Sequence, residues 1–316
     1  MSATSALPPR PRVWLTGGQG MVARNIAEHA AAAGWELMAP SRAELDLERA
    51  EAVQAFVRET RPDVVIHAAG RVGGIQANIA HPVDFLVRNV DIGRNVIMAA
   101  HTAGVPRLIN LASSCMYPRQ GQNPLREELV LAGELEPTNE GYAIAKIYAT
   151  RLCQYLRRQE PALQYKTLIP CNLYGRFDKF DPAHSHLIPA VIRKIHEAKQ
   201  AGAATVEIWG DGLARREFMD AADLADAVLR HVAQGESAPE LMNIGLGFDY
   251  TINEYYAAVA RVVGWQGEFV HDLSKPVGMR QKLVDVSRQT AWGWAPKISL
   301  EQGIARCYDY FLDKVA

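Results

Sequence analysis

The sequence predicts an α/β protein built on a Rossmann-type, doubly wound parallel sheet, with a smaller mixed α/β lobe. Across residues 12–172, short apolar runs alternate with longer helix-like segments. A glycine-rich turn follows the first apolar run and opens the first helix. Strands that alternate with helices favour a parallel sheet covered on both faces, and a glycine turn at this place is typical of dinucleotide-binding folds.

Composition narrows the class of protein. The chain has 316 residues, enough for one large domain or two smaller ones. Its 48% apolar and 22% charged residues are ordinary for a globular protein, and its net charge of −1 predicts no nucleic acid partner. The same net charge predicts no membrane as a partner, and because no run of about 18 apolar residues occurs, we expect no membrane span.

The cysteines and the N-terminal stretch indicate a compartment. The 4 cysteines are scattered and no pair has metal-like spacing, so we expect free thiols, no metal site and a cytoplasmic protein. Residues 1–11 contain no apolar segment of the kind found in signal peptides, and their prolines predict a disordered leader.

Residues 12–16 form the first predicted strand, and a helix to about residue 33 follows its glycine turn. Gly17 permits a tight turn, and Gly20 lets the backbone approach a pyrophosphate at the helix N-terminus, where free N–H groups favour anions. The alternative is plain turn chemistry. The residues predicted to contact a dinucleotide here are Gly17, Gly18, Gln19, Gly20, Met21, Val22 and Ala23.

The second predicted strand, residues 35–39, indicates which dinucleotide is bound. An acid at the end of this strand holds the ribose 2′-hydroxyl in sites that prefer NAD. Here Ser41 and Arg42 follow the strand, with no acid before Glu44. A serine and an arginine suit a 2′-phosphate, so we predict NADP as the cofactor; a surface arginine is the alternative. A further helix ends near residue 60.

The third and fourth predicted strands bring small and polar residues to one edge of the sheet. The third, residues 63–67, runs into Ala68, Ala69 and Gly70, which leave room for a cofactor. A long helix over residues 82–103 follows. The fourth strand, residues 108–112, delivers residues 113–118 to the carboxyl edge, where ligands bind in open α/β folds.

Tyr142 and Lys146 stand four residues apart in a predicted helix over residues 142–159, so they share one helix face. An ammonium beside a phenol favours the phenolate and is expected to lower the pKa of the phenol. Such a tyrosine exchanges a proton with a substrate oxygen near pH 7. The spacing also arises by chance in surface helices; the glycine turn and the Ser113–Cys115 stretch favour the catalytic interpretation.

The character of the chain changes after a strand and its exit at residues 165–175. A polar loop at 177–185, a helix at 188–200 and a strand at 206–210 follow. Arg215 and Arg216 then suit bidentate phosphate contacts, or are solvated surface charges. We expect residues 12–175 to form mainly the NADP-binding domain, and residues 176–316 mainly a substrate-binding lobe with some strands and helices returning to the first domain.

The motifs together resemble those of a known family. With residues 17–23, Ser113, Tyr142 and Lys146, the chain resembles the extended short-chain dehydrogenase/reductase superfamily, and within it the GDP-L-fucose synthase family. The similarity runs from about residue 12 to the C-terminus. The motifs that carry it are Gly20-Met21-Val22, residues 71–75, 113–118, 136–140, 172–175, 185–189, 216–218 and 274–276.

The resemblance implies a two-stage reaction on a GDP-4-keto-6-deoxy-hexose, with GDP-4-keto-6-deoxy-D-mannose converted to GDP-L-fucose. C3 and C5 are epimerised, and hydride from NADPH then reduces C4. By resemblance Cys115 is the base and His186 the acid of the epimerisation, Tyr142 is the acid of the reduction, and Lys146 holds the nicotinamide ribose. Ser113 hydrogen-bonds the C4 oxygen. The alternative is the same scaffold acting on another GDP-keto-sugar, of the GDP-L-colitose or GDP-heptose type, or acting as a 4-reductase only.

Chemistry alone leaves some of these roles open. As a residue type, Cys115 is more often a small buried hydrophobe, Trp209 equally suits a core, and His184 is as good an acid as His186. Ser113 and Ser114 are separated only by the family pattern. The substrate-binding residues implied by the resemblance are Ser113, Ser114, Asn172, Lys194, Trp209, Arg216 and Lys282.

Further cofactor contacts and the partner also follow from the resemblance. Members of the superfamily pair two long helices per subunit into a dimer, here 82–103 and 142–159, so a homodimer is expected. The chain departs from the family pattern at Gln19, Gly141, Cys171 and residues 277–280. The remaining cofactor-binding residues are Arg42, Asp46, Leu47, Ala68, Ala69, Leu111, Ala112, Lys146, Pro170, Asn172, Leu173 and His186.

Overall fold

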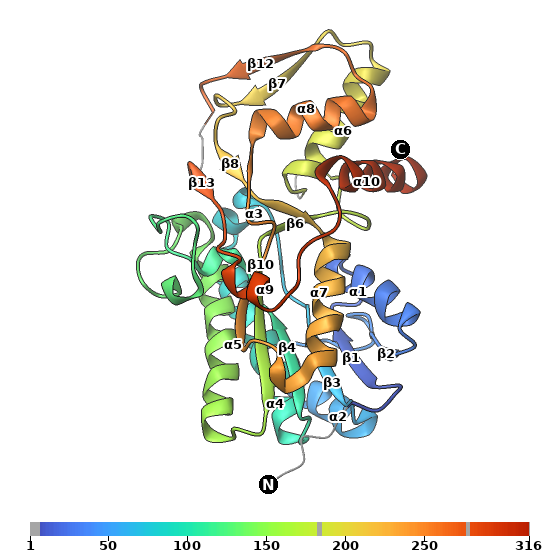
Figure 1. Ribbon diagram of the computed structural model, residues 1–316, viewed down its shortest axis with the longest axis vertical. Coiled ribbons are helices and arrows are strands. Elements are labelled where there is room, and N and C mark those ends of the chain that lie inside the picture. The colour runs from blue at the N-terminus through green and yellow to red at the C-terminus, as the bar shows by residue number, and fades with distance from the viewer. Residues whose placement is uncertain (1–6, 182–184, 276–278, 316) are drawn as a thin grey trace.

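A six-stranded parallel sheet forms the centre of the computed structural model, which describes residues 7–181, 185–275 and 279–315 (Figure 1). The predicted fold class is therefore confirmed. β3, β4 and β5 are buried along their whole length, as expected where helices cover both sides of a parallel sheet, whereas the edge strand β2 is partly exposed. In spatial order the strands are β10 (Leu241–Ile244), β5 (Gln164–Pro170), β4 (Arg107–Leu111), β3 (Val64–His67), β1 (Arg12–Thr16) and β2 (Glu36–Met38).

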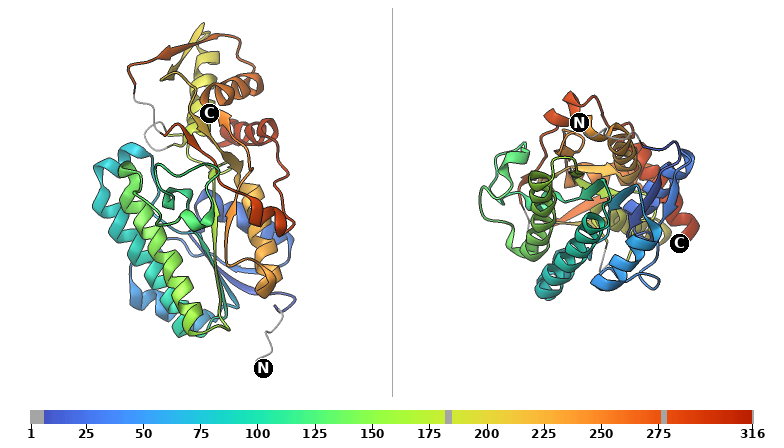
Figure 2. Two further views of the ribbon diagram at one scale, coloured as in Figure 1. Left: turned by 60° about the vertical axis from the view of Figure 1, so that its left-hand side comes forward. Right: turned by 90° about the horizontal axis from the view of Figure 1, so that it is seen from below.

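Two helical layers cover the sheet (Figure 2). Alternate strand residues point to opposite faces, so Trp14 packs with one layer, whereas Val13 and Leu15 pack with the other. The first layer consists of α2 (Ala50–Thr60), α4 (Pro82–Thr102) and α5 (Glu140–Gln159). The second consists of α1 (Met21–Ala32), α7 (Ala221–Gln234) and the short α9 (Ser287–Ala291).

A smaller lobe with its own apolar core sits beyond the carboxyl edge of the sheet (Figure 1). Its helices begin and end as local chemistry dictates: Thr251 and Glu254 form a capping box at the start of α8, and Gly264 ends it in the left-handed region. The helices of this lobe are α6 (Leu187–Gln200), α8 (Ile252–Val263) and α10 (Leu300–Lys314). Its strands are β7 (Thr205–Trp209), paired with β12 (Glu268–Asp272), and β8 (Arg215–Arg216), paired with β11 (Tyr250–Thr251) and β13 (Gln281–Lys282).

Two segments after residue 175 return to the central sheet. β9 (Phe218–Asp220), which pairs with β6 (Asn172–Tyr174), leads into α7, and α7 covers the sheet. β10 then adds the outermost strand.

Some boundaries and short elements differ from the predictions. α3 (Ile75–Ala80) was not predicted, and the expected turn at 137–141 is a 3-10 helix (Pro137–Asn139) followed directly by α5. Such short elements carry little periodicity to predict them from.

One buried carboxylate links the lobe to the sheet. Glu217, 1% exposed between β8 and β9, accepts hydrogen bonds from the backbone N–H groups of Leu246 (2.6 Å), Gly247 (3.0 Å) and Val284 (3.0 Å). Leu246 and Gly247 follow β10, and Val284 follows β13. Burial raises the pKa of Glu217 to about 7, while the three donors oppose that shift.

We expect Glu217→Ala to lower the free energy of unfolding by about 2–3 kcal/mol, because three backbone donors lose their acceptor. Since the pKa of Glu217 in the folded protein lies above its usual 4.5, its stabilising contribution is lost as the pH rises through about 7. The difference in the free energy of unfolding between wild type and Glu217→Ala should therefore shrink as the pH rises from 4.5 to about 7. Urea denaturation at several pH values measures this. Glu268→Ala, at an exposed position of β12, is the control. Equal stabilities of wild type and Glu217→Ala at a pH below 4.5, where the contribution of Glu217 is fully present, would contradict this role.

Candidate active site

The glycine turn lies between β1 and α1, at the carboxyl end of β1. Gly17 has a φ of +75°, and the N–H of Gly20 donates to the Gly17 carbonyl at 2.8 Å. A Cβ on Gly18 would lie 2.7 Å from the Ala39 carbonyl oxygen, and one on Gly17 would lie 3.0 Å from Cα of Ala69. The turn therefore packs against the exits of β2 and β3 as only glycine allows, which is the cradle that a dinucleotide pyrophosphate requires.

The residues predicted at the adenosine end lie after β2. The Arg42 guanidinium is exposed and donates from Nη2 to Glu48 at 2.9 Å. Asp46 accepts from the Glu48 backbone N–H, and the Leu47 carbonyl accepts from Asn95 of α4 at 2.9 Å. The sequence did not single out Glu48, which intervenes between the predicted phosphate ligand Arg42 and α4.

Small residues line the path toward the middle of the sheet. Thr16, at the end of β1, accepts hydrogen bonds from the backbone N–H groups of Ala68 (3.1 Å) and Ala69 (3.0 Å) through Oγ1. Because the carboxyl ends of parallel strands meet at one edge, further predicted residues collect there. They are Leu111 and Ala112 after β4, and Pro170, Asn172 and Leu173 around β5 and β6. The residues present therefore fit a dinucleotide laid across this edge.

Ser113, Cys115, Tyr142 and Lys146 come together where β4 ends and α5 begins. The Cys115 backbone N–H donates to Ser113 Oγ at 3.3 Å within the first turn of a 3-10 helix (Ser114–Met116). Lys146 Nζ donates to the Leu111 carbonyl at 2.9 Å and lies 5.7 Å from the centre of the Tyr142 ring. The sequence predicted this grouping; the Leu111 carbonyl as anchor of the ammonium was not predicted.

The electrostatics of this cluster differ from the expectation for Tyr142. Burial, followed by the nearby Cys115, raises the pKa of the Tyr142 phenol instead of lowering it. Burial also lowers the pKa of Lys146 to about 8, because the charged ammonium is less stable away from water. The ammonium donates a hydrogen bond to the Leu111 carbonyl. The expected lowering of the phenol pKa is therefore not found, and Tyr142 is held protonated, the form from which a proton can be donated.

Opposing effects act on the pKa of the Cys115 thiol. Burial raises the pKa of its thiol, whereas Lys282, a hydrogen bond with Ser113, and Lys146 each act to lower it. Lys282 reaches this place because β13 pairs with β8, which sets Lys282 beside Arg216 in register. Within the described ranges, neither a hydrogen bond nor an ion pair engages the Lys282 ammonium, and burial lowers its pKa. Two lysines therefore face one buried thiol.

The predicted catalytic residue His186 and the predicted substrate residues Lys194 and Trp209 lie in the small lobe. His186 is the residue before α6, and its side chain is exposed. Its pKa is lowered by desolvation from the protein atoms around it and then by the positive charge of Lys179. Lys194 of α6 donates to the Glu207 carbonyl at 2.5 Å. Trp209, at the end of β7, is 62% exposed, so it is not a core residue. His184 and residues 276–278 lie outside the described residues.

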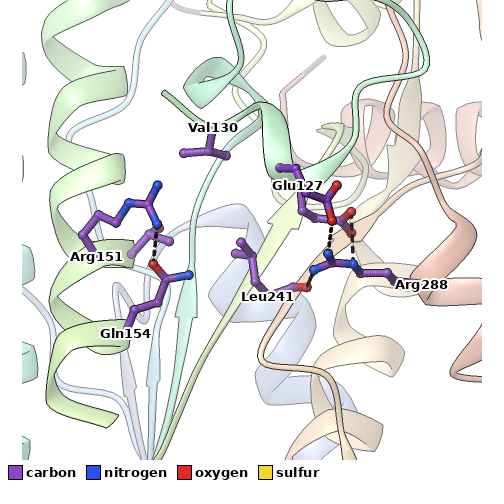
Figure 3. Close-up of a pocket in the computed structure, with 8 residues that line it drawn as sticks. Glu127, Val130, Arg151, Gln154, Leu241 and Arg288 are labelled. Carbon is purple, nitrogen blue, oxygen red and sulfur yellow. Dashed lines mark hydrogen bonds and ion pairs between the residues drawn. The ribbon is translucent and has the colours of Figure 1, made fainter. Parts of the chain in front are cut away.

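A cavity of about 320 Å³ lies elsewhere, between α5 and the outer strand β10 (Figure 3). Arg151 and Gln154 face it from α5 and are hydrogen-bonded to each other, and Glu127 opposite is paired with Arg288. None of the predicted catalytic residues lines it. We therefore locate the candidate active site from the convergence of side chains at the sheet edge.

Two kinds of feature are absent from the residues that the structure describes. No helix there is both long enough and apolar enough to traverse a bilayer. No group of three or more His, Cys, Asp or Glu side chains in those ranges is arranged to hold a metal ion.

Comparison with known proteins identifies the family. The model of the NAD dependent epimerase/dehydratase family matches residues 13–245. The chain is 52% identical to the GDP-L-fucose synthase of Azorhizobium caulinodans, covering 95% of this chain and 96% of that protein. It is 50% identical to the GDP-L-colitose synthase of Yersinia pseudotuberculosis, covering 96% and 98%. Among solved structures, the GDP-mannoheptose C4 reductase of Campylobacter jejuni with NADP bound superposes with a TM-score of 0.88 at 31% identity, covering 97% and 100%.

The chain therefore belongs to the NAD dependent epimerase/dehydratase family and, within it, to the GDP-L-fucose synthase family whose motifs it shares. The resemblance stated from the sequence is confirmed.

Proposed function

We propose that this enzyme converts GDP-4-keto-6-deoxy-D-mannose to GDP-L-fucose, by epimerisation at C3 and C5 and NADPH-dependent reduction at C4. The observation that carries the proposal is the convergence of Ser113, Cys115, Tyr142 and Lys146 at the carboxyl edge of the sheet. Support also comes from relatives named GDP-L-fucose synthase that match nearly the whole chain.

In the epimerisation, Cys115 is the base. Its thiolate takes the proton from the carbon next to the C4 ketone, and the electron pair moves onto the C4 oxygen as an enolate. Ser113 and the protonated Tyr142 are placed to donate hydrogen bonds to that oxygen, which makes the C–H acidic enough to ionise. His186 returns a proton to the opposite face of the carbon. Exchange of protons with solvent then resets both groups for the second carbon.

Burial raises the pKa of Cys115, so the thiolate forms only where nearby positive charges stabilise it. Lys282 and Lys146 provide these charges, since a cation near a thiol favours the thiolate. The same two lysines therefore promote the form of Cys115 that accepts a proton.

In the reduction, Tyr142 donates its proton to the C4 oxygen. NADPH, when bound, supplies the hydride to C4. Lys146 has ammonium protons left after its bond to Leu111 and holds the nicotinamide ribose. Burial raises the pKa of Tyr142, so the phenol is in the protonated form that this step requires.

The GDP portion is held from the small lobe. Arg216 and Lys282 stand side by side on β8 and β13 and suit a diphosphate. We expect Lys194 of α6 and the exposed Trp209 of β7 to contact the GDP portion as well.

Turnover of GDP-4-keto-6-deoxy-D-mannose with NADPH in heavy water tests the proposal. We expect NADPH oxidation together with carbon-bound deuterium at C3 and C5, detected by mass spectrometry. Cys115→Ser should abolish the incorporation, while Cys153→Ala, which removes a buried thiol elsewhere on α5, should retain it. Oxidation without deuterium on carbon would contradict the epimerase function and leave a 4-reductase.

A second candidate is favoured by one specific observation, the 50% identity to a GDP-L-colitose synthase. In that case the preferred ketone would lack the 3-hydroxyl. A higher kcat/KM for the 3,6-dideoxy ketone than for GDP-4-keto-6-deoxy-D-mannose would select this alternative.

We further propose that the enzyme is a cytoplasmic homodimer paired through α4 and α5. All four cysteines are free thiols, as a reducing compartment favours. The two helices lie along each other on one side of the molecule (Figure 2) and expose apolar side chains. These are Val83 (69%) and Val87 (48%) on α4, and Ile144 (41%) and Tyr155 (53%) on α5.

We expect sedimentation equilibrium at micromolar concentration to give twice the chain mass of 34.8 kDa. Val87→Glu combined with Ile144→Glu should yield monomers, because burying two carboxylates in an apolar interface is costly. Val270→Glu, at an exposed position of the small lobe, is the control. A wild type that sediments only as single chains would refute the dimer.

A further inference from the structure

Glu48 stands between two guanidinium groups at the adenosine end of the dinucleotide site. One Oε atom accepts from Arg42 Nη2 at 2.9 Å, and both accept from Arg88 Nε, at 3.0 and 2.9 Å. The Arg42 side chain is 66% exposed, whereas those of Glu48 and Arg88 are 24% and 28% exposed. Glu48 is thus the inner member of the triad and Arg42 the outer one.

The fold anchors the three residues unequally. Arg88 belongs to α4, a 21-residue helix packed against the sheet, and it grips the Glu48 carboxylate through both oxygens. The Glu48 backbone is fixed as well, because its N–H donates to Asp46. Arg42 has no other hydrogen bond or ion pair than Glu48 within the described ranges. Arg42 is therefore free to exchange its partner, while Glu48 stays in place.

Charge at this place decides between the two dinucleotides. A 2′-phosphate is attracted by guanidinium groups and repelled by carboxylates, whereas a 2′-hydroxyl can donate to a carboxylate. The Glu48 carboxylate offsets one of the two guanidinium charges, and Asp46 adds a second carboxylate nearby. Gln19, in the glycine turn, adds no positive charge. A 2′-phosphate that binds here must therefore compete with the Glu48 carboxylate for Arg42, its predicted ligand.

We propose that Glu48 is a specificity-determining residue that weakens the preference for the 2′-phosphorylated cofactor. To bind the 2′-phosphate, Arg42 leaves Glu48, and Arg88 alone keeps the carboxylate neutralised. In the absence of that phosphate, Glu48 can accept the ribose 2′-hydroxyl. The enzyme consequently discriminates between NADP and NAD less than one whose arginine is unpaired. This inference rests on the proposed use of NADP and adds the two residues that limit it.

The test measures binding of two fragments by isothermal titration calorimetry: adenosine 2′,5′-bisphosphate, which carries the 2′-phosphate, and adenosine 5′-monophosphate, which does not. We expect Glu48→Gln to raise the ratio of their association constants by about tenfold, since one negative charge near the phosphate is removed. Arg88→Met should lower the ratio, because the remaining carboxylate is less neutralised and holds Arg42 more firmly. Glu51→Gln, on the exposed first turn of α2, is the matched control and should leave the ratio unchanged.

The outcomes separate the possible errors. A purely structural role of Glu48 would weaken both fragments equally, so an unchanged ratio in Glu48→Gln and Arg88→Met would overturn the assignment even if the variants were less stable. If the wild type binds both fragments and the ratio of their association constants is unchanged in the two variants, only the role of Glu48 is refuted. Failure of the wild type to bind either fragment would overturn the proposed dinucleotide site together with it.

Discussion

The hydrogen bond from Lys146 to the Leu111 carbonyl fixes the geometry on which the active site depends. It ties the first turns of α5 to the end of β4, and so sets Tyr142 against the Ser113–Cys115 turn. A buried ammonium without an acceptor would be costly, and the carbonyl at the sheet edge provides one. The same contact leaves other ammonium protons for a ribose and places a positive charge near the Cys115 thiol.

The small lobe completes the site through Glu217. This carboxylate follows Arg216 directly and holds Val284, two residues after Lys282. It therefore helps to fix Arg216 and Lys282, the two cations proposed to bind the substrate, and Lys282 in turn acts to lower the pKa of Cys115. One buried acid at the junction of lobe and sheet thus positions residues that we propose to act on the sugar and to hold the phosphates.

Much of the fold followed from local patterns. Alternating apolar runs predicted the parallel sheet, and the glycine turn predicted its dinucleotide edge, because both are properties of short segments. Contacts between distant segments could not be predicted: Glu48 and Arg88 are 40 residues apart, and Glu217 and Val284 are 67 apart. The pKa of Tyr142 was predicted in the wrong direction because the Tyr-x-x-x-Lys spacing reports proximity to a cation but not burial, which dominates here.

In the proposed mechanism, separate groups transfer protons in the two steps: Cys115 and His186 exchange protons with carbon, and Tyr142 donates a proton to oxygen. Tyr142→Phe tests this division most directly, with deuterium exchange into the ketone and NADPH oxidation measured on the same sample. We predict that oxidation falls by about 10²–10⁴-fold, as expected for loss of a general acid. Exchange should slow far less, because Ser113 still stabilises the enolate. Equal loss of both rates, with cofactor binding intact, would contradict the account.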